Sequence, residues 1–261
     1  MAGLLEGKTA IIYGGGGGIG GGVARTFARE GARVFLAGRT KGTLDVAAKD
    51  IKSAGGSAEV AVVDALDEQA VDRHVQDVVS TTGRVDVSFN LITRGDVQGI
   101  PLVQMQTDDL LRAVTTGLRS NFITSRAAGR KMVEQRSGVI LHLNSASGDA
   151  AMPGMGSTGP ADAATESFMR YLAAELGLHG VRVCGIWTAG VADTLSEEKM
   201  KSVNENVPDL SKVKEMLAGM SVLRRNIRLS DVAEAAAFLA SDRAAGITGT
   251  MLNVTSGLVL K

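Results

Sequence analysis

The feature that most constrains this chain is a glycine-rich stretch near the N-terminus, where eight of the ten residues from 13 to 22 are glycine. The stretch follows the apolar run 9–12, which predicts a buried strand. After it, apolar residues recur at helical spacing, at Val23, Ala24, Phe27 and Ala28. Free backbone N–H groups at the start of such a helix attract an anion, and glycine lets the backbone approach phosphates closely. A flexible linker is the alternative, but linkers are seldom held between a strand and a helix, so we predict a site for a nucleotide pyrophosphate.

Composition excludes several classes of function. The 261 residues are 44% hydrophobic, which is enough to bury the core of one large α/β domain. Lys plus Arg and Asp plus Glu balance at 28 each, so we expect a small-molecule partner and no nucleic acid. No apolar run reaches the ~20 residues of a membrane helix, and the N-terminus lacks the apolar region of a signal peptide. The single cysteine, Cys184, excludes an intrachain disulfide, and together these features predict a cytoplasmic protein.

Strand-like and helix-like periodicities alternate along the whole chain. We expect strands at 8–13, 32–37, 58–63, 85–90, 138–144, 181–187 and 250–254. We expect helices at 19–30, 44–54, 68–82, 107–132, 158–177 and 231–241, the fourth with a break near Gly117. This alternation predicts an α/β fold with one doubly wound parallel sheet of about seven strands, helices on both faces, and a single domain over residues 1–261. Ligands in such sheets bind at the carboxyl ends of the strands.

One segment, at about 193–225, is too long to be a simple connection between a strand and a helix. It is polar, amphipathic and rich in methionine, and an excursion of this kind is usually a lid over the substrate. Its apolar residues Met200, Met216, Leu217 and Met220 can form the inner side of such a lid, or simply the buried face of an ordinary helix. Both interpretations remain open.

The motifs, in their order and spacing, resemble the short-chain dehydrogenase/reductase family from end to end. Gly14, Gly18 and Gly20 match the family's glycine loop, and Ser145, within Asn-Ser-Ala-Ser-Gly, matches its catalytic serine. The resemblance implies a Rossmann-type domain that binds a nicotinamide dinucleotide. The binding residues it implies are Gly14, Gly18, Ile19, Gly20, Asp64, Ala65, Asn90, Val191 and Thr194. It also implies a homotetramer or homodimer, formed through the two long helices beside the active site and the C-terminal strand.

The active site is where the chain departs from the family. The family's Tyr stands thirteen residues after its Ser and its Lys four further on, and these positions hold Thr158 and Asp162. The Asn that the family carries on the preceding helix is replaced by Gly117. Only Ser145 remains of the four catalytic residues, because both tyrosines of the chain lie elsewhere in the sequence. The candidate catalytic residues are therefore Ser145, Thr158 and Asp162.

These replacements change the chemistry that the site can perform. A threonine hydroxyl does not ionise in the working range, and an aspartate raises the pKa of a neighbouring acid where a lysine lowers it. Asp162 can still accept hydrogen bonds from the ribose hydroxyls of a dinucleotide. In the alternative interpretation, Thr158 is only a helix N-cap and Asp162 is a first-turn acid that the helix dipole favours.

The end of the second strand bears on the choice of dinucleotide. Proteins that prefer NAD usually carry an acid there for the ribose 2′-hydroxyl, whereas this chain has Gly38. Arg39 offers a planar donor fork for a 2′-phosphate, and Thr40 and Lys41 can add a hydroxyl and a charge. We therefore predict NADP(H) in preference to NAD(H), with Arg39 and Thr40 at the cofactor. No metal is expected, because no His, Cys or carboxylate cluster has metal-ligand spacing.

Three classes of function remain open. The first is an NADP(H)-dependent oxidoreductase with a rebuilt proton-transfer site, the second a dinucleotide-binding protein without catalysis, and the third a non-redox isomerase or lyase. The dinucleotide motifs favour the first two, and Ser145 with the 193–225 segment favours the first over the second. Within the first class, reduction of an imine or iminium ion fits best. A carboxylate at Asp162 stabilises positive charge, and hydride addition to an iminium carbon needs no tyrosine proton.

Overall fold

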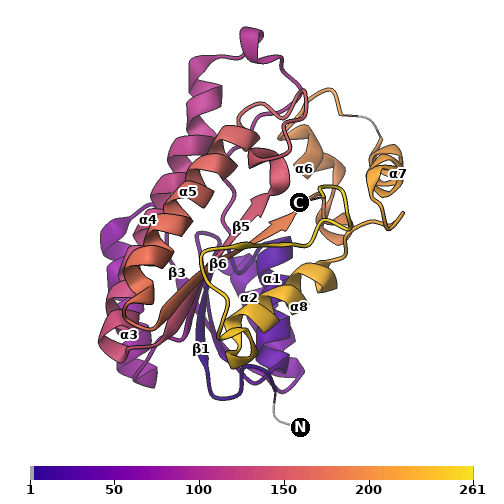
Figure 1. Ribbon diagram of the computed structural model, residues 1–261. Coiled ribbons are helices and arrows are strands. Elements are labelled where there is room, and N and C mark those ends of the chain that lie inside the picture. The colour runs from indigo at the N-terminus through magenta and orange to yellow at the C-terminus, as the bar shows by residue number, and fades with distance from the viewer. Residues whose placement is uncertain (1–2, 208, 261) are drawn as a thin grey trace.

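Seven parallel strands form one sheet in the order β3-β2-β1-β4-β5-β6-β7 (Figure 1). The computed structural model describes residues 3–207 and 209–260. The strands are β1 (Thr9–Tyr13), β2 (Arg33–Gly38), β3 (Ser57–Val62), β4 (Val87–Asn90), β5 (Gly138–Ser145), β6 (Val181–Thr188) and β7 (Met251–Asn253). β1 pairs with β2 on one side and with β4 on the other, so the strand order reverses beside β1. This confirms the predicted doubly wound sheet, and the reversal is where ligands bind in sheets of this kind.

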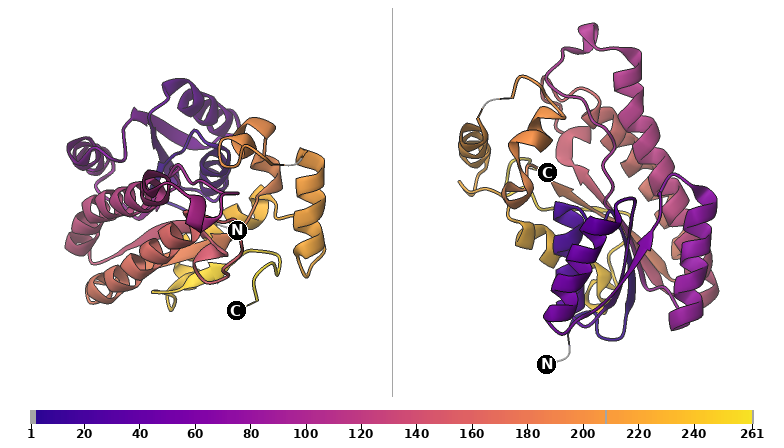
Figure 2. Two further views of the ribbon diagram at one scale, coloured as in Figure 1. Left: turned by 90° about the horizontal axis from the view of Figure 1, so that it is seen from above. Right: turned by 180° about the vertical axis from the view of Figure 1, so that it is seen from behind.

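Helices cover both faces of the sheet. One face carries α1 (Gly18–Arg29), α2 (Lys41–Ser53) and α8 (Leu229–Ala240), and the other carries α3 (Glu68–Thr82), α4 (Thr107–Gln135) and α5 (Thr158–Gly177). Two shorter helices, α6 (Glu197–Lys201) and α7 (Leu210–Met220), follow β6. Seen from above, the two helical layers flank the sheet (Figure 2). None of the described helices is both long and apolar enough to cross a bilayer.

The central strand β1 links the two layers of the core. All five of its residues are buried, as expected of a parallel strand that is covered on both faces. Ala10 and Ile12 point into the layer beneath α1, α2 and α8, and Ile11 and Tyr13 point into the layer beneath α3, α4 and α5. The apolar run that precedes the glycine loop is therefore buried on both sides.

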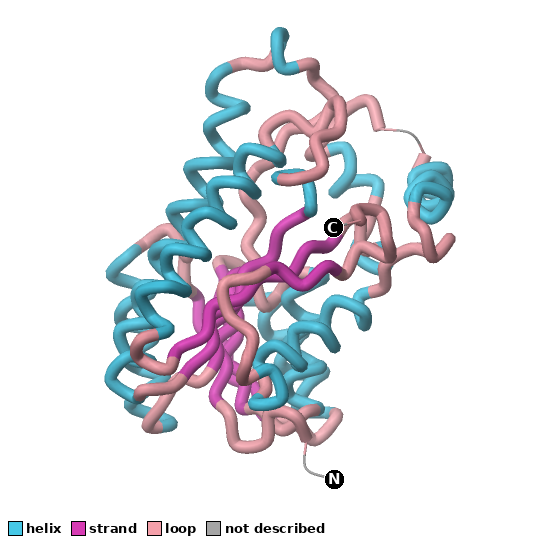
Figure 3. Tube along the Cα trace, in the orientation of Figure 1, coloured by secondary structure: helices cyan, strands magenta, loops and turns pink. Residues whose placement is uncertain are grey.

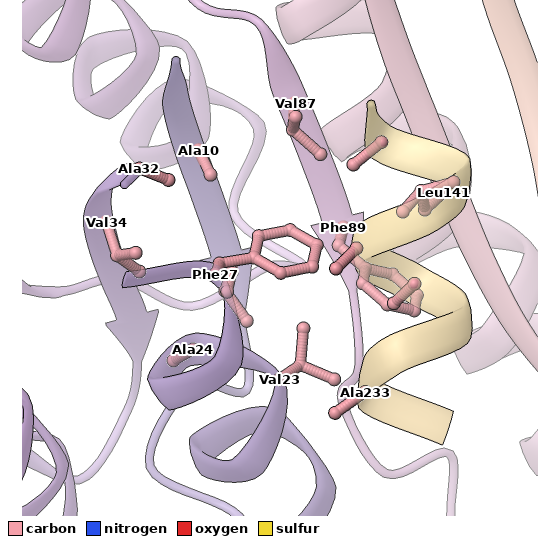
Figure 4. Packing of buried hydrophobic residues seen from close by; sticks show 14 of the residues in the cluster. Ala10, Val23, Ala24, Phe27, Ala32, Val34, Val87, Phe89, Leu141 and Ala233 are labelled. Carbon is pink, nitrogen blue, oxygen red and sulfur yellow. The ribbon is translucent and has the colours of Figure 1, made fainter. Parts of the chain in front are cut away.

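Helix α1 is held against the sheet by the apolar side chains that recur along one of its faces. Val23, Ala24 and Phe27 are buried, and Phe27 lies between β1 and β4 with Phe89 nearby (Figure 4). Full burial of each large side chain contributes about 1.5–3 kcal/mol relative to exposure. This packing fixes the start of α1, and with it the glycine loop, at the carboxyl end of β1.

Two helices differ from the prediction. The predicted break near Gly117 is wrong, because α4 runs without interruption from Thr107 to Gln135 (Figure 2, right). A glycine costs a helix interior about 1 kcal/mol, and here the burial of one helical face, which includes Ala113 and Ile123, outweighs that cost. α2 begins at Lys41 and not at Leu44, since Thr40 has the extended backbone of an N-cap.

The segment 193–225 lies at the end of the molecule where the strands have their carboxyl ends (Figure 1, Figure 3). It contains α6 and α7 and is joined to the loop after β4, where the Gln98 amide donates to the Val203 carbonyl oxygen at 2.8 Å. Its methionines do not share one environment, because Met200 is buried while Met216 and Met220 are exposed. The buried methionine thus lies on α6, and both methionines of α7 are exposed.

The close approach of Gly20 to Gly14 generates a stability prediction. A Cβ at Gly20 would overlap the Gly14 carbonyl oxygen, whereas at Gly21 the nearest atom is the Arg25 guanidinium, 3.5 Å away. We expect Gly20→Ala to lower the free energy of unfolding by about 1–3 kcal/mol, as overpacking does. Gly21→Ala is the matched control and should raise it by up to about 1 kcal/mol, because alanine favours the helix. Urea unfolding of both variants tests this, and equal stabilities would contradict it.

Candidate functional site

The glycine loop forms a cradle at the carboxyl end of β1. Gly14 has a φ of 76°, and a Cβ there would lie 2.6 Å from the Leu91 carbonyl oxygen after β4. Gly17 stands at the N-cap of α1 without a side-chain cap, so the first backbone N–H groups of α1 have no side-chain partner. The predicted residues Gly14, Gly18, Ile19 and Gly20 all lie in this turn. Uncapped N–H groups at a helix start are the feature that binds anions in proteins.

The other end of the predicted cofactor site lies at β2 and α2. Arg39 and Thr40 are exposed, and Arg39 forms no ion pair with any described residue. The ammonium group of Lys41 lies 2.6 Å from the Asp45 carboxylate in an exposed ion pair. A Cβ at Gly16 would overlap the Thr43 hydroxyl, so the N-terminus of α2 lies directly against the glycine loop.

The remaining predicted cofactor residues fall into two groups. Asp64 is exposed after β3, with its carboxylate accepting from the Leu66 amide at 3.0 Å, and Ala65 beside it is buried. Thr194 lies over the start of α1, where a Cβ at Gly18 would come within 2.9 Å of it. Its hydroxyl donates to the carbonyl oxygen of Val191, which is itself buried. The structure therefore brings these side chains to the same end of the sheet as the loop.

The side chain of Asn90, at the end of β4, forms hydrogen bonds to other residues of the protein. Its amide nitrogen donates to the Ser120 hydroxyl at 3.1 Å and to the Asn121 side-chain oxygen at 3.2 Å, both on α4. Its own side-chain oxygen accepts from the Ile92 amide at 3.2 Å. These bonds tie the end of β4 to α4 and fix the direction in which the following loop leaves.

Ser145 and Asp162 meet at the end of β5. Ser145 is the last residue of β5, and its hydroxyl oxygen lies 2.5 Å from Oδ2 of Asp162 on α5. The Ser145 and Ser147 hydroxyl oxygens are 2.8 Å apart. A hydroxyl has one proton, and an ionised carboxylate only accepts, so Ser145 donates to Asp162 whenever that carboxylate is charged.

Arg94 holds the other oxygen of Asp162. Its Nη1 donates to Asp162 Oδ1 at 2.7 Å, and its Nη2 donates to Asp96 Oδ1 at 2.7 Å. The Asp162 side chain is fully buried, and the Arg94 side chain is only 14% exposed. Burial raises the pKa of Asp162 from its usual value to about 6, although Arg94 and the Ser145 hydroxyl act in the opposite direction. The expected free carboxylate beside a ribose is thus already paired with a guanidinium.

Thr158 is held by the same loop. Gln98 Nε2 donates to the Thr158 hydroxyl oxygen at 3.0 Å, and the Thr158 side chain is buried. The alternative interpretation of these positions is wrong in its geometry. Thr158 is the first residue of α5 and not its N-cap, which is Ser157, and no acid stands in the first turn. Asp162 is one turn further on.

Gly117 belongs to the same cluster. A Cβ at Gly117 would lie 2.7 Å from Cδ of Arg94, so the glycine leaves space for the arginine side chain. Thr158, Asp162 and Gly117 therefore converge on the loop after β4. Sequence analysis missed Arg94, Asp96 and Gln98. The available signal was a cation a few residues after β4 in a chain with an acid at position 162.

A second buried acid lies one helical turn below Asp162. Glu166 Oε1 accepts from the Trp187 indole at 2.7 Å and from the Asn144 amide nitrogen at 3.4 Å. The same Asn144 nitrogen donates to the backbone oxygen of Asp162 at 3.2 Å. These bonds fasten α5 to the ends of β5 and β6, which fixes where Asp162 stands.

The other titratable side chains lie away from this cluster. Tyr13 is buried against His74 of α3, and burial raises its pKa, while Tyr171 is 73% exposed on α5. Burial lowers the pKa of His142 to about 4, and this ring stacks on Phe168 beneath α5. Within the described residues no three metal-ligating side chains come together. Ser145 is thus served by Asp162 and not by a phenol.

Comparison with known proteins gives concordant results. Residues 15–259 match the family described as enoyl-(acyl carrier protein) reductase. The 3-oxoacyl-(acyl-carrier-protein) reductase of Chlamydia trachomatis serovar D is 32% identical over 259 residues, covering 99% of this chain and all of the relative. Tropinone reductase-like 1 of Erythroxylum coca is 34% identical over 260 residues, covering 97% of this chain and 90% of the relative. The structure of a short-chain type dehydrogenase/reductase from Mycobacterium ulcerans superposes with a TM-score of 0.86 at 27% identity, covering 97% of this chain and 90% of that one.

Proposed function

The chain belongs to the short-chain dehydrogenase/reductase family of oxidoreductases, and from that premise we propose that it is an NADP(H)-dependent reductase with a rebuilt proton-transfer site. The observation that carries the proposal is the 2.5 Å contact between the Ser145 hydroxyl and Asp162. A site that had merely decayed would leave its replaced residues without a common arrangement. Here Thr158, Asp162 and Gly117 all contact one loop, and the family's serine keeps a titratable partner.

The adenosine end supports NADP(H) over NAD(H). Gly38 provides no carboxylate to repel a 2′-phosphate, and the exposed Arg39 is free of ion pairs among the described residues. Thr40 caps α2 by its backbone alone, so its hydroxyl and the first N–H groups of α2 have no capping bond. A phosphate at this position would meet a guanidinium, a hydroxyl and a helix N-terminus together. We also propose that four further residues bind this cofactor, namely Asp64, Ala65, Val191 and Thr194.

The direction of the hydrogen bond between Ser145 and Asp162 decides whether the serine hydroxyl accepts a hydrogen bond from the substrate or donates one to it. A bound dihydronicotinamide supplies the hydride. With Asp162 ionised, the Ser145 proton points to Asp162, and the serine oxygen offers the substrate a lone pair. A substrate N–H of an iminium ion can donate to that oxygen, whereas a carbonyl oxygen cannot. With Asp162 protonated, the carboxyl group donates to Ser145, and the serine hydroxyl becomes free to donate to a carbonyl.

The charge of the cluster also favours a cationic substrate. Arg94 contributes one positive charge, and Asp96 and Asp162 contribute two negative charges when both are ionised, which leaves one negative charge in the cluster. The sequence suggested that the Asp162 carboxylate stabilises a cationic substrate. The Arg94 guanidinium weakens this stabilisation but does not cancel it. We propose an imine or iminium ion as the substrate class, with Ser145 as its hydrogen-bond acceptor and Thr158 orienting it.

Two other functions fit the same geometry. The full burial of Asp162 and the hydrogen bond between Gln98 and Thr158 are also expected of a protein that binds a dinucleotide and catalyses nothing. A carboxylate whose pKa lies at about 6 can equally abstract a proton in a non-redox isomerisation or elimination. Cofactor oxidation with a substrate present separates the reductase from both alternatives, because only the reductase consumes NADPH.

Two proposals concern the surroundings of the site. We propose that α6 and α7 act as a lid, since the segment reaches the loop that carries Arg94. We also propose that the protein forms a homodimer or homotetramer. The outer faces of α4 and α5 expose the apolar side chains Phe122, Tyr171 and Leu178, which suits a two-fold contact of paired helices.

The cofactor proposal predicts that NADPH binds more tightly than NADH. Arg39→Ala should weaken NADPH binding about tenfold or more, because a hydrogen bond to a charged group contributes about 1.5–3 kcal/mol, and should leave NADH binding unchanged. Lys41→Ala is the matched control, since Asp45 already holds Lys41. Calorimetric titration of the wild type and both variants measures all six affinities, and equal dissociation constants for the two dinucleotides in the wild type would overturn the proposal.

The mechanism predicts a preference for imines that depends on pH. At pH 7.5 the wild type should reduce a cyclic imine faster than the matched ketone, and Asp162→Asn should lower kcat/KM for the imine about tenfold or more. As the pH falls through about 6, Asp162 takes up a proton, so imine reduction should fall and ketone reduction should rise. The Asn variant, which cannot ionise, controls for protonation of the substrate itself. Imine reduction indifferent to Asp162→Asn would remove the basis of the mechanism.

The assembly proposal predicts a sedimenting species larger than the 27.0 kDa chain at micromolar concentration. Phe122→Arg should shift that species toward the monomer, because it places a charge in the proposed helix contact. Val46→Arg, at an exposed apolar residue on α2 outside that contact, is the control. A 27.0 kDa species for the wild type would contradict the proposal.

A further inference from the structure

Two of the three departures from the family, Gly117 and Asp162, meet at one side chain that sequence analysis had not considered. We infer that Arg94 is a positioning residue for the Ser145–Asp162 pair, and that Gly117 and Asp162 form one coupled unit with it. The inference rests on the proposed function for its catalytic meaning. Its geometric content stands on the contacts among Arg94, Asp162 and Gly117 themselves.

The first contact is steric. α4 is a regular helix at Gly117, so nothing in its backbone requires glycine there. The side chain of Arg94 supplies the reason, because a Cβ at Gly117 would lie 2.7 Å from its Cδ and 3.4 Å from its Cγ. The asparagine that the family carries at this position is larger still. Arg94 can therefore reach Asp162 only if α4 presents no side chain at Gly117.

The second contact is electrostatic and directional. The Arg94 fork places Nε and Nη2 on Asp96, at 3.3 and 2.7 Å, and Nη1 on Asp162, at 2.7 Å. Two bonds to Asp96 fix the plane of the guanidinium, so the third bond fixes Oδ1 of Asp162. Oδ2 is then left facing Ser145. A lysine carries a point charge and cannot hold both carboxylates in fixed planes.

The third step concerns ionisation. Asp162 is surrounded by Arg94 and Asp96 from the loop, Ser145 from β5 and Glu166 one turn away on α5. Burial and the charge of Asp96 raise the pKa of Asp162, and Arg94 lowers it by its charge and its hydrogen bond. Loss of Arg94 would remove these lowering effects, so the pKa of Asp162 would rise further toward neutral pH. Arg94 thus keeps the carboxylate charged and the Ser145 proton directed toward it.

The loop that carries Arg94 has attachments that do not depend on the ion pair. The Val97 amide donates to the Ser157 hydroxyl at 3.0 Å, and the Gly99 amide donates to the Gly154 carbonyl oxygen at 2.7 Å. These bonds link the loop to the segment before α5. Conservative variants of Arg94 should therefore retain the path of the loop, and their effects should report on the side chain.

Carboxyl ¹³C NMR titration of aspartate-labelled protein tests the inference without substrate or cofactor. Asp162→Asn assigns the Asp162 resonance by its disappearance. We expect Arg94→Gln to raise the titration midpoint of Asp162 by about one pH unit or more, which is a tenfold change in proton affinity. The reason is that the variant removes the positive charge that favours the ionised carboxylate. Arg94→Lys, which keeps the charge, should restore part of the shift. An unchanged midpoint in Arg94→Gln would overturn the inference.

The coupling to Gly117 has its own test. Gly117→Ala should raise the titration midpoint of Asp162, as Arg94→Gln does. In an Arg94→Ala background, which has no Cδ at this position, Gly117→Ala should leave the midpoint unchanged. Gly177→Ala, where a Cβ meets open space, is the control. Equal effects of Gly117→Ala in both backgrounds would show that the two residues act independently and would overturn the coupling. If the Asp162 midpoint shifts as expected in these variants but the protein reduces neither imine nor ketone, the positioning role of Arg94 stands and the proposed function is overturned.

Discussion

The backbone of Gly20 passes so close to the carbonyl oxygen of Gly14 that no side chain fits between them, and the binding end of the molecule is built around this contact. The contact lets α1 start directly beneath the end of β1, with its uncapped N–H groups turned toward the carboxyl ends of the strands. Gly14 also lies against the backbone of Leu91, which brings the exit of β4 to the same place. The glycine loop and the loop that carries Arg94 are thus neighbours because two backbones approach closely.

Around that frame, the site depends on a guanidinium held between two carboxylates in a largely dry environment. A buried ion pair adds little net stability, because desolvation offsets most of the attraction, but removing one partner is costly. Such a pair is better suited to fixing geometry than to stabilising a fold. In this protein it fixes which oxygen of Asp162 faces Ser145. The cation that neutralises this buried acid of α5 comes from the loop after β4.

The fold could be predicted because its information is local and repeated. Each strand and helix has its own periodicity, and the glycine loop marks the end of β1 without reference to distant residues. The candidate positions Thr158, Asp162 and Gly117 could also be counted from the sequence. The compensating partner could not, since Arg94 and Asp162 stand 68 residues apart and the length of a loop does not show where its side chains point. For the same reason Gly117 suggested a helix break, although its smallness serves the arginine of another segment.

The burial of the Arg94–Asp162 pair limits the order in which the sequence of this protein can change. A lysine at position 162 would set two cations side by side in a cavity that admits little water, so a return toward the family pattern cannot begin there. It cannot begin with a larger residue at Gly117 either, because the arginine occupies that volume. Arg94 has to be replaced first, and that step leaves Asp96 and Asp162 as neighbouring carboxylates without a cation. Every mutational path back therefore passes through a less stable intermediate, and relatives that carry the arginine should also carry the glycine and the acid.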